Sequence, residues 1–86
     1  MEPSTTRQLW FIDDLLKGFK RRLPSIAATR RQFPTKEAAQ KAIDELLKAE
    51  SREAERINNL PVEMRLMAHK ELTDEEWERI KNGGSK

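Results

Sequence analysis

Residues 35–59 read TKEAAQKAIDELLKAESREAERINN, a segment rich in strong helix formers. Thr35 is a good N-cap, and Glu37 follows in the first turn, where the helix dipole favours an acid. The apolar positions recur at helical spacing: Ala39, Ile43, Leu46, Leu47, Ala54, Ile57 and Leu60. We therefore predict one long helix over about 35–59, roughly 35 Å in length at 1.5 Å per residue. Its part from Lys48 to Glu55 offers only alanines as apolar residues, so we expect it to project beyond the core.

A second amphipathic helix is predicted from Thr5 to about Leu23. Thr5 and Gln8 fit a capping box, and Pro24 disfavours the α conformation in the residue before it. The apolar face consists of Leu9, Ile12, Leu15, Leu16, Phe19 and Leu23. Trp10 and Phe11 lie beside this face and point about 100° apart, so one small core does not readily cover both. The alternative is that Trp10 packs against Trp77 inside the core.

The remaining segments are shorter. Pro61 suits a first helical position and opens a predicted helix that runs to about Leu72. Thr73 and Glu76 form a second capping box, and Gly83 with Gly84 ends that helix and leaves 83–86 as a flexible tail. Residues 24–34 are predicted to be a basic irregular connector, with a short helix capped by Ser25 as the alternative. The fold class is therefore all-α: a single domain over 1–86, a small bundle of about four helices with little or no sheet.

Composition excludes several classes of protein. The chain has 86 residues, enough for one domain, and no cysteine, so disulfides, thiol catalysis and cysteine-ligated zinc are ruled out. No apolar run is long enough to span a membrane, and the N-terminus lacks the pattern of a signal peptide. We expect a soluble, intracellular protein of the cytoplasm.

Catalysis is disfavoured by elimination. The single histidine, His69, has no metal-ligand spacing around it. The serines have no nucleophile-elbow motif, and the three glycines form no phosphate-binding loop. Paired acids stand at helix N-terminal ends, where the helix dipole explains them. We expect no enzyme activity, no cofactor and no metal site.

The net charge of +2 hides an uneven distribution. Residues 1–36 hold eight basic and three acidic residues, whereas residues 37–86 hold nine basic and twelve acidic ones. A basic block on a small domain can contact phosphates, an acidic protein surface or a membrane. One hypothesis is therefore a small DNA- or RNA-binding protein that uses the basic segment 17–36. Its phosphate contacts would be Lys17, Arg30, Arg31 and Lys36.

A short local match accompanies this hypothesis. Residues 33–39, FPTKEAA, resemble the entry to the helix in arm-type DNA-binding domains of phage integrases. The match covers seven residues, and the three-stranded sheet of that family has no counterpart here, because the upstream segment has a helical pattern. No residue role is carried over from it.

Protein binding is the hypothesis we favour. The first predicted helix concentrates the scarce large apolar side chains next to the basic block, and aromatic and arginine side chains are common interface anchors. We expect a non-catalytic accessory or regulatory protein that binds a larger protein or assembly stoichiometrically, with homo-oligomerisation as a further option. In size, charge and lack of cysteine the chain is similar to phage and plasmid accessory proteins. The predicted partner contacts are Trp10, Phe11, Lys20, Arg21 and Arg22.

Overall fold

The computed structural model describes residues 2–82, and the predicted all-α class is confirmed. In chain order the helices are α1 (Thr6–Gly18), α2 (Ile26–Gln32), α3 (Lys36–Asn58), α4 (Val62–Arg65) and α5 (Asp74–Lys81). Within residues 2–82 the only strand-type pairing is one isolated antiparallel bridge between Pro3 and Thr35. The predicted tail over 83–86 lies outside the described residues.

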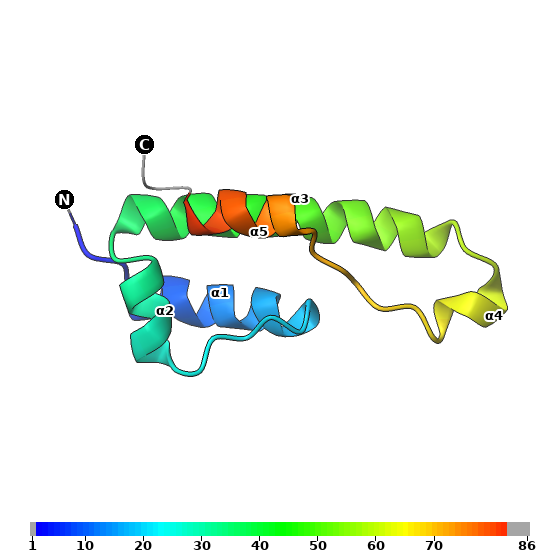
Figure 1. The fold of residues 1–86 in the computed structure, drawn as a ribbon, viewed down its shortest axis with the longest axis horizontal. Helices are drawn as coiled ribbons and strands as arrows, with labels where there is room; N and C mark the ends of the chain where they lie inside the picture. The colour runs from blue at the N-terminus through cyan, green and yellow to red at the C-terminus, as the bar shows by residue number, and fades with distance from the viewer. Residues whose placement is uncertain (1, 83–86) are drawn as a thin grey trace.

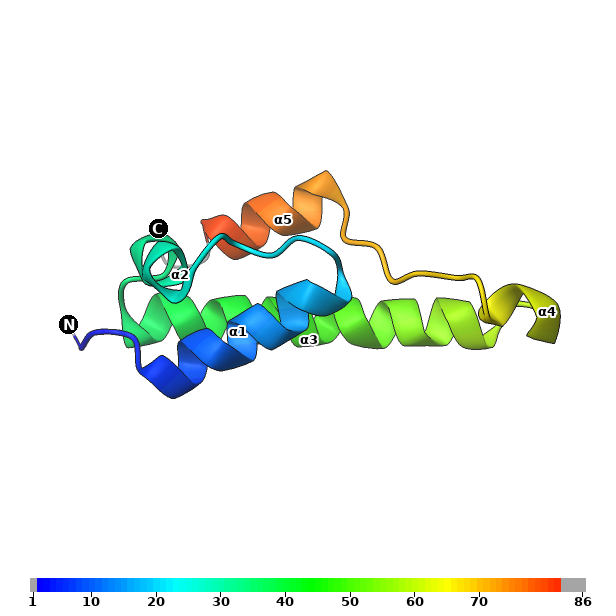
Figure 2. The same cartoon turned by 90° about the horizontal axis from the view of Figure 1, so that it is seen from below.

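The long helix α3 runs the length of the molecule, and the other helices are arranged around it (Figure 1). α1 lies alongside its first half and runs in the same direction, while α5 packs on it in the opposite direction (Figures 1 and 2). α2 crosses at the end where α3 begins and links α1 to it. α4 stands alone at the far end of α3.

The core lies between α1, the first half of α3 and α5. Four buried alanines of α3 allow the neighbouring helices to approach closely, and Phe33, only 1% exposed, fills the end near α2. Trp77 is partly buried against this core, and Trp10 is not a member of it. The buried apolar residues of the cluster are Ile12, Leu15, Leu16, Phe19, Phe33, Ala38, Ala39, Ala42, Ile43, Leu46, Ala49, Leu72 and Ile80.

The helix α1 ends five residues earlier than predicted, at Gly18 instead of Leu23. The chain leaves it through a Schellman motif, in which the Lys20 N–H donates to the Lys17 carbonyl and the Arg21 N–H donates to the Leu16 carbonyl, both at 3.1 Å. Lys20 takes the left-handed conformation, with φ of 59°, that this motif requires. The backbone hydrogen bonds of the turn therefore end the helix before Pro24 is reached.

The prediction of an irregular connector over 24–34 is wrong for its central part, where the structure has the helix α2. Ser25 is the N-cap, and its hydroxyl accepts from the Ala28 N–H at 3.1 Å. Thr29 is buried and donates its hydroxyl to the Ser25 carbonyl at 3.0 Å. Burial of Phe33 directly after the helix supplies the packing that a seven-residue helix needs, because short helices are marginal alone.

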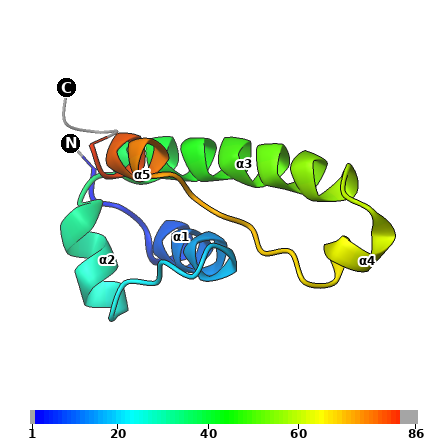
Figure 3. The same ribbon diagram turned by 45° about the vertical axis from the view of Figure 1, so that its right-hand side comes forward.

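The predicted helix over 62–72 is also corrected. Only α4, a single turn, forms, and residues 66–73 return along α3 in a non-helical conformation (Figure 3). Backbone groups of this segment are bonded by side chains of α3: the His69 and Glu71 carbonyls accept from Arg56 and Arg52, at 3.0 and 3.3 Å. Those carbonyls therefore accept from side chains instead of from the backbone N–H groups of a continuing helix. The next helix, α5, begins as predicted, with the Thr73 and Glu76 capping box complete.

Candidate functional site

The outer face of α1 carries an apolar groove against α3. Trp10 is 61% exposed and Phe11 is 43% exposed, although both are large aromatic side chains. They line a groove of about 520 Å³ together with Gln40 and Ile43 of α3. The remaining lining residues are Thr5, Arg7, Gln8 and Asp14. We call this feature the α1 groove.

Local structure fixes the position of the α1 groove. Leu9 and Ile12 are fully buried, and they turn the helix so that Trp10 and Phe11 fall outside the core. The capping box joins Thr5 and Gln8, and the Gln8 side chain also donates to the Lys36 carbonyl at 3.3 Å, which ties the start of α1 to α3. The charged lining residues, Arg7 and Asp14, are of opposite sign. The groove can therefore accept apolar side chains with little electrostatic selection.

The three basic residues predicted as partner contacts have different surroundings in the structure. Arg21 donates to the Leu72 carbonyl at 3.3 Å and to Asp74 at 3.1 Å, and its guanidinium lies 5.7 Å from the centre of the Trp77 ring. Arg22 pairs with Asp13 at 3.4 Å. Lys20 is exposed in the turn after α1. Arg21 thus fastens the turn after α1 to α5, whereas Lys20 and Arg22 stay exposed, as the aromatic pair does.

The structure also engages part of the predicted set of phosphate contacts within the domain. Arg30 donates to the Ser4 carbonyl at 2.7 Å, and Lys36 pairs with Glu2 at 3.0 Å. Within residues 2–82, Lys17 and Arg31 make no ion pair and are exposed. They stand on different helices, α1 and α2. Of the four predicted phosphate contacts, two are thus engaged within the domain.

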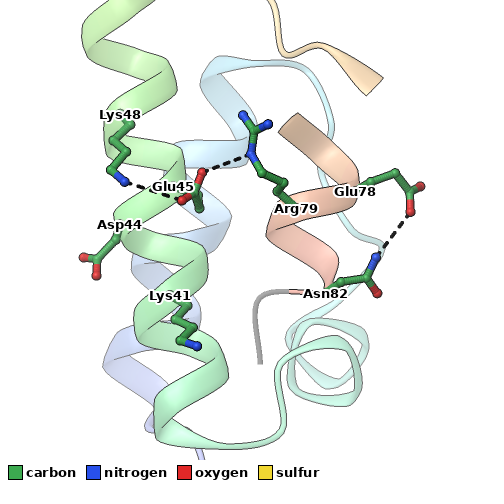
Figure 4. Close-up of a pocket in the computed structure, with 7 residues that line it drawn as sticks. All are labelled: Lys41, Asp44, Glu45, Lys48, Glu78, Arg79 and Asn82. Atoms are coloured by element: carbon green, nitrogen blue, oxygen red, sulfur yellow. Dashed lines mark hydrogen bonds and ion pairs between the residues drawn. The ribbon is translucent and has the colours of Figure 1, made fainter. Parts of the chain in front are cut away.

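A larger groove of about 570 Å³ lies between α3 and α5 (Figure 4). Its charges are largely paired within the domain: Glu45 faces Lys48 at 3.6 Å and Arg79 at 3.5 Å. Its seven lining residues, all drawn in Figure 4, include no buried one. A solvated ion-pair surface of this kind offers a small ligand no enclosed polar contact.

A buried carboxylate on α3 is the feature that the sequence analysis missed. Glu53 is only 1% exposed, and both of its oxygens are occupied. Arg56 donates to them from Nε and Nη2, each at 2.9 Å, and Arg52 donates to Oε2 at 2.6 Å. The backbone N–H of Glu71 donates to Oε1 at 2.8 Å. Arg52 continues to Glu76 of α5 at 2.7 and 3.0 Å. We call Arg52, Glu53, Arg56 and Glu76 the Glu53 clamp.

The Glu53 clamp lowers the pKa of both of its acids. The bidentate hydrogen bond from Arg56 is the main cause for Glu53 and outweighs its desolvation, and with the Glu71 N–H and the nearby charges it lowers the pKa from 4.5 to about 2. Burial opposes the charged form of Glu76, but hydrogen bonds from Thr73 and Arg52 outweigh it, so the pKa of Glu76 is lowered as well. Glu53 is therefore a charged residue held inside the fold by two arginines.

The pKa of Glu53 predicts an acid-sensitive contribution to stability. Because its pKa is lower in the folded chain, the stabilisation is complete above about pH 4.5 and is lost as the pH falls toward about 2. It amounts to about 3 kcal/mol at most. In urea denaturation we expect the difference in unfolding free energy between wild type and Glu53→Gln to shrink over this pH window. A difference that stays constant from pH 5 to pH 2 would contradict the assignment.

Beyond the Glu53 clamp the chain exposes a second apolar surface. We call residues 54–71 the arm: the end of α3, α4 and the segment that returns from it. No residue of the arm is buried. It nevertheless presents Val62 at 69%, Met64 at 55%, Leu66 at 89% and Met67 at 80% exposure. These side chains were predicted to lie on a helix running to Leu72, whereas the structure leaves them around a single turn in solvent.

Among residues 2–82, no group of three or more His, Asp or Glu side chains is placed to hold a metal ion. None of the described helices has the length and apolar character needed to cross a membrane. Comparison with protein families, with curated proteins and with solved structures finds no match to this chain.

Proposed function

We propose that this protein is a non-catalytic accessory or regulatory protein that binds a larger protein through the α1 groove. The observation that carries the proposal is the exposure of Trp10 and Phe11 beside a groove on a well-packed helix. Aromatic side chains exposed together are costly in water and are the commonest interface anchors. The partner would supply an apolar side chain or a short apolar helix face to the groove.

The rigidity of the groove supports stoichiometric binding. Its walls are α1 and α3, which share the core, and its start is fixed by hydrogen bonds of Gln8. A preformed site loses little conformational entropy when it binds, so a modest surface can give useful affinity. Arg7 at the rim can pair with an acid of the partner.

Trp10→Ala tests the proposal. Trp10 is mostly exposed, so we expect the variant to keep its helical circular dichroism and to lose less than about 1 kcal/mol of stability. Loss of a hot-spot aromatic costs about 2 kcal/mol or more in binding, roughly a 30-fold weaker affinity. Quantitative pull-down from the native host should show this loss, while Arg31→Ala, another exposed side chain, should retain capture. A folded Trp10→Ala protein that recovers the same partners to the same extent would overturn the proposal.

The nucleic-acid alternative has a separate test. Titration of labelled duplex and single strands at two salt concentrations reports contact with phosphates, because such binding weakens steeply with salt. We expect no salt-dependent binding at micromolar protein, since several of the described basic residues are already engaged within the domain. Salt-dependent binding that Arg31→Ala weakens would replace the protein-binding proposal.

A further inference from the structure

We propose that the end of the arm is a self-association surface, on which a second copy of this chain docks about a two-fold axis. The surface consists of Val62, Met64, Leu66 and Met67, which we call the tip. It lies at the opposite end of α3 from α2, well beyond the end of α1 (Figures 1 and 3). The proposal is therefore independent of the function proposed for the α1 groove.

The tip holds most of the large apolar side chains that the described residues expose to solvent. The structure has seven large apolar side chains in exposed positions among its described residues, and four of them fall within residues 62–67. At 55–89% exposure, these four present on the order of 400 Å², about the largest patch that a monomer usually leaves in water. This is about half of the roughly 800 Å² per partner that a stable dimer buries, so the polar side chains around the tip must supply the other half of the interface.

The arm holds the tip away from the core without covering it. The radius of gyration is 13.8 Å, against about 12 Å for a compact domain of this length, and the longest dimension is 47 Å. The arm is attached by polar contacts: Glu53 to Glu71, Arg56 to His69, and Lys70 to Glu50 at 3.6 Å. Arg65 closes the turn by donating to the Asn58 and Leu60 carbonyls, at 2.8 and 2.9 Å. The tip is thus presented in a defined shape, with its apolar side chains left for another surface.

Charge at the tip favours a second copy as the occupant. Glu63 and Arg65 flank Met64 in the same turn, and among the described residues neither is paired with an opposite charge. A two-fold axis places the same patch on both sides, so Glu63 of one copy can face Arg65 of the other while the apolar side chains meet. An anionic membrane or a nucleic acid would find no excess of positive charge there, because residues 54–71 hold three acidic and three basic side chains. The patch is complementary to itself.

Oligomeric state as a function of concentration tests the proposal. We expect sedimentation equilibrium of the full chain, from about 1 to about 500 μM, to show a monomer–dimer equilibrium. Leu66→Glu changes a side chain that is 89% exposed, so the fold should be unaffected while dimerisation weakens at least about tenfold. Trp10→Ala is the matched control, since it removes an exposed apolar side chain from the α1 groove and should leave the dimer intact.

Cross-linking gives a second readout, because the natural chain has no cysteine. Leu66→Cys should form a disulfide-linked dimer under mild oxidation much faster than Glu75→Cys, which is exposed on α5. Equal rates for the two variants, or a wild-type chain that stays monomeric over the whole concentration range, would overturn the proposal. So would flotation of the wild-type chain with neutral lipid vesicles that Leu66→Glu abolishes, which would assign the tip to a lipid surface.

Discussion

Phe33→Ala is expected to lower the free energy of unfolding by about 4 kcal/mol. Phe33 is the largest of the fully buried side chains and closes the end of the core where α2 meets α3. Its removal loses the burial of an aromatic ring and leaves a cavity that α2, only seven residues long, cannot close without losing its own packing. A small domain has little reserve, so the variant should be partly unfolded near room temperature. Urea denaturation followed by helical circular dichroism measures the change.

The same substitution at Phe11 is the control. Phe11 is 43% exposed, so Phe11→Ala should cost less than about 1.5 kcal/mol and leave the helical content unchanged. The two variants make the same chemical change, Phe to Ala, once in the core and once in the α1 groove. A loss below about 1.5 kcal/mol for Phe33→Ala, or equal losses at the two sites, would show that the core has been placed wrongly.

Glu53→Ala is expected to cost about 3 kcal/mol at neutral pH. The substitution leaves Arg52 and Arg56 without their shared acid, and the Glu71 N–H without its acceptor. Removing one member of a buried ion pair is expensive because the remaining charges keep their desolvation cost. Both arginines are almost half exposed, which limits the loss compared with a fully enclosed pair. Thermal unfolding and urea denaturation at pH 7 measure it.

Glu55→Ala is the matched control on the same helix. Glu55 is exposed and, within residues 2–82, makes no ion pair, so its replacement should change stability by less than about 0.5 kcal/mol. Acid should remove most of the difference between wild type and Glu53→Ala, because the pKa of Glu53 is lowered to about 2 in the folded chain. An equal effect of the two substitutions at pH 7 would contradict a clamp centred on Glu53.

The parts of the fold that follow from local chemistry were predictable. The long helix was expected over 35–59 and is Lys36–Asn58, because Thr35 supplies the cap and the helix formers are continuous. The Thr73 and Glu76 box placed the start of α5 in the same way. The end of α1 was missed because the left-handed residue that ends many helices is usually a glycine. Here Lys20 takes that conformation, two residues after Gly18. The stretch after α4 was missed because its partners are the side chains of Arg52, Glu53 and Arg56, 13 to 19 residues away in the sequence.

Part of the candidate site was also predictable: the exposure of its aromatic side chains, but not the contacts of its charged ones. Adjacent aromatic side chains on an amphipathic helix cannot both face one core, and Trp10 and Phe11 are indeed both exposed. The basic residues could not be placed in this way, because whether a charge is free depends on tertiary neighbours such as Asp74 for Arg21. No local pattern in the sequence distinguishes Glu53 from the other acids of α3. Only the fold shows that two arginines and a backbone amide converge on it.

The arm and the core are held by different forces, and this sets the order in which the chain opens. The core around α1 is apolar and opens only when the whole domain unfolds, so its amide protons should exchange with solvent slowly. The arm is fastened mainly by charged groups near its base, and salt weakens such contacts while leaving apolar packing intact. Its amides should therefore exchange first, through a local opening. Raised ionic strength should therefore speed the exchange of the amides of the arm more than that of the amides in the apolar core.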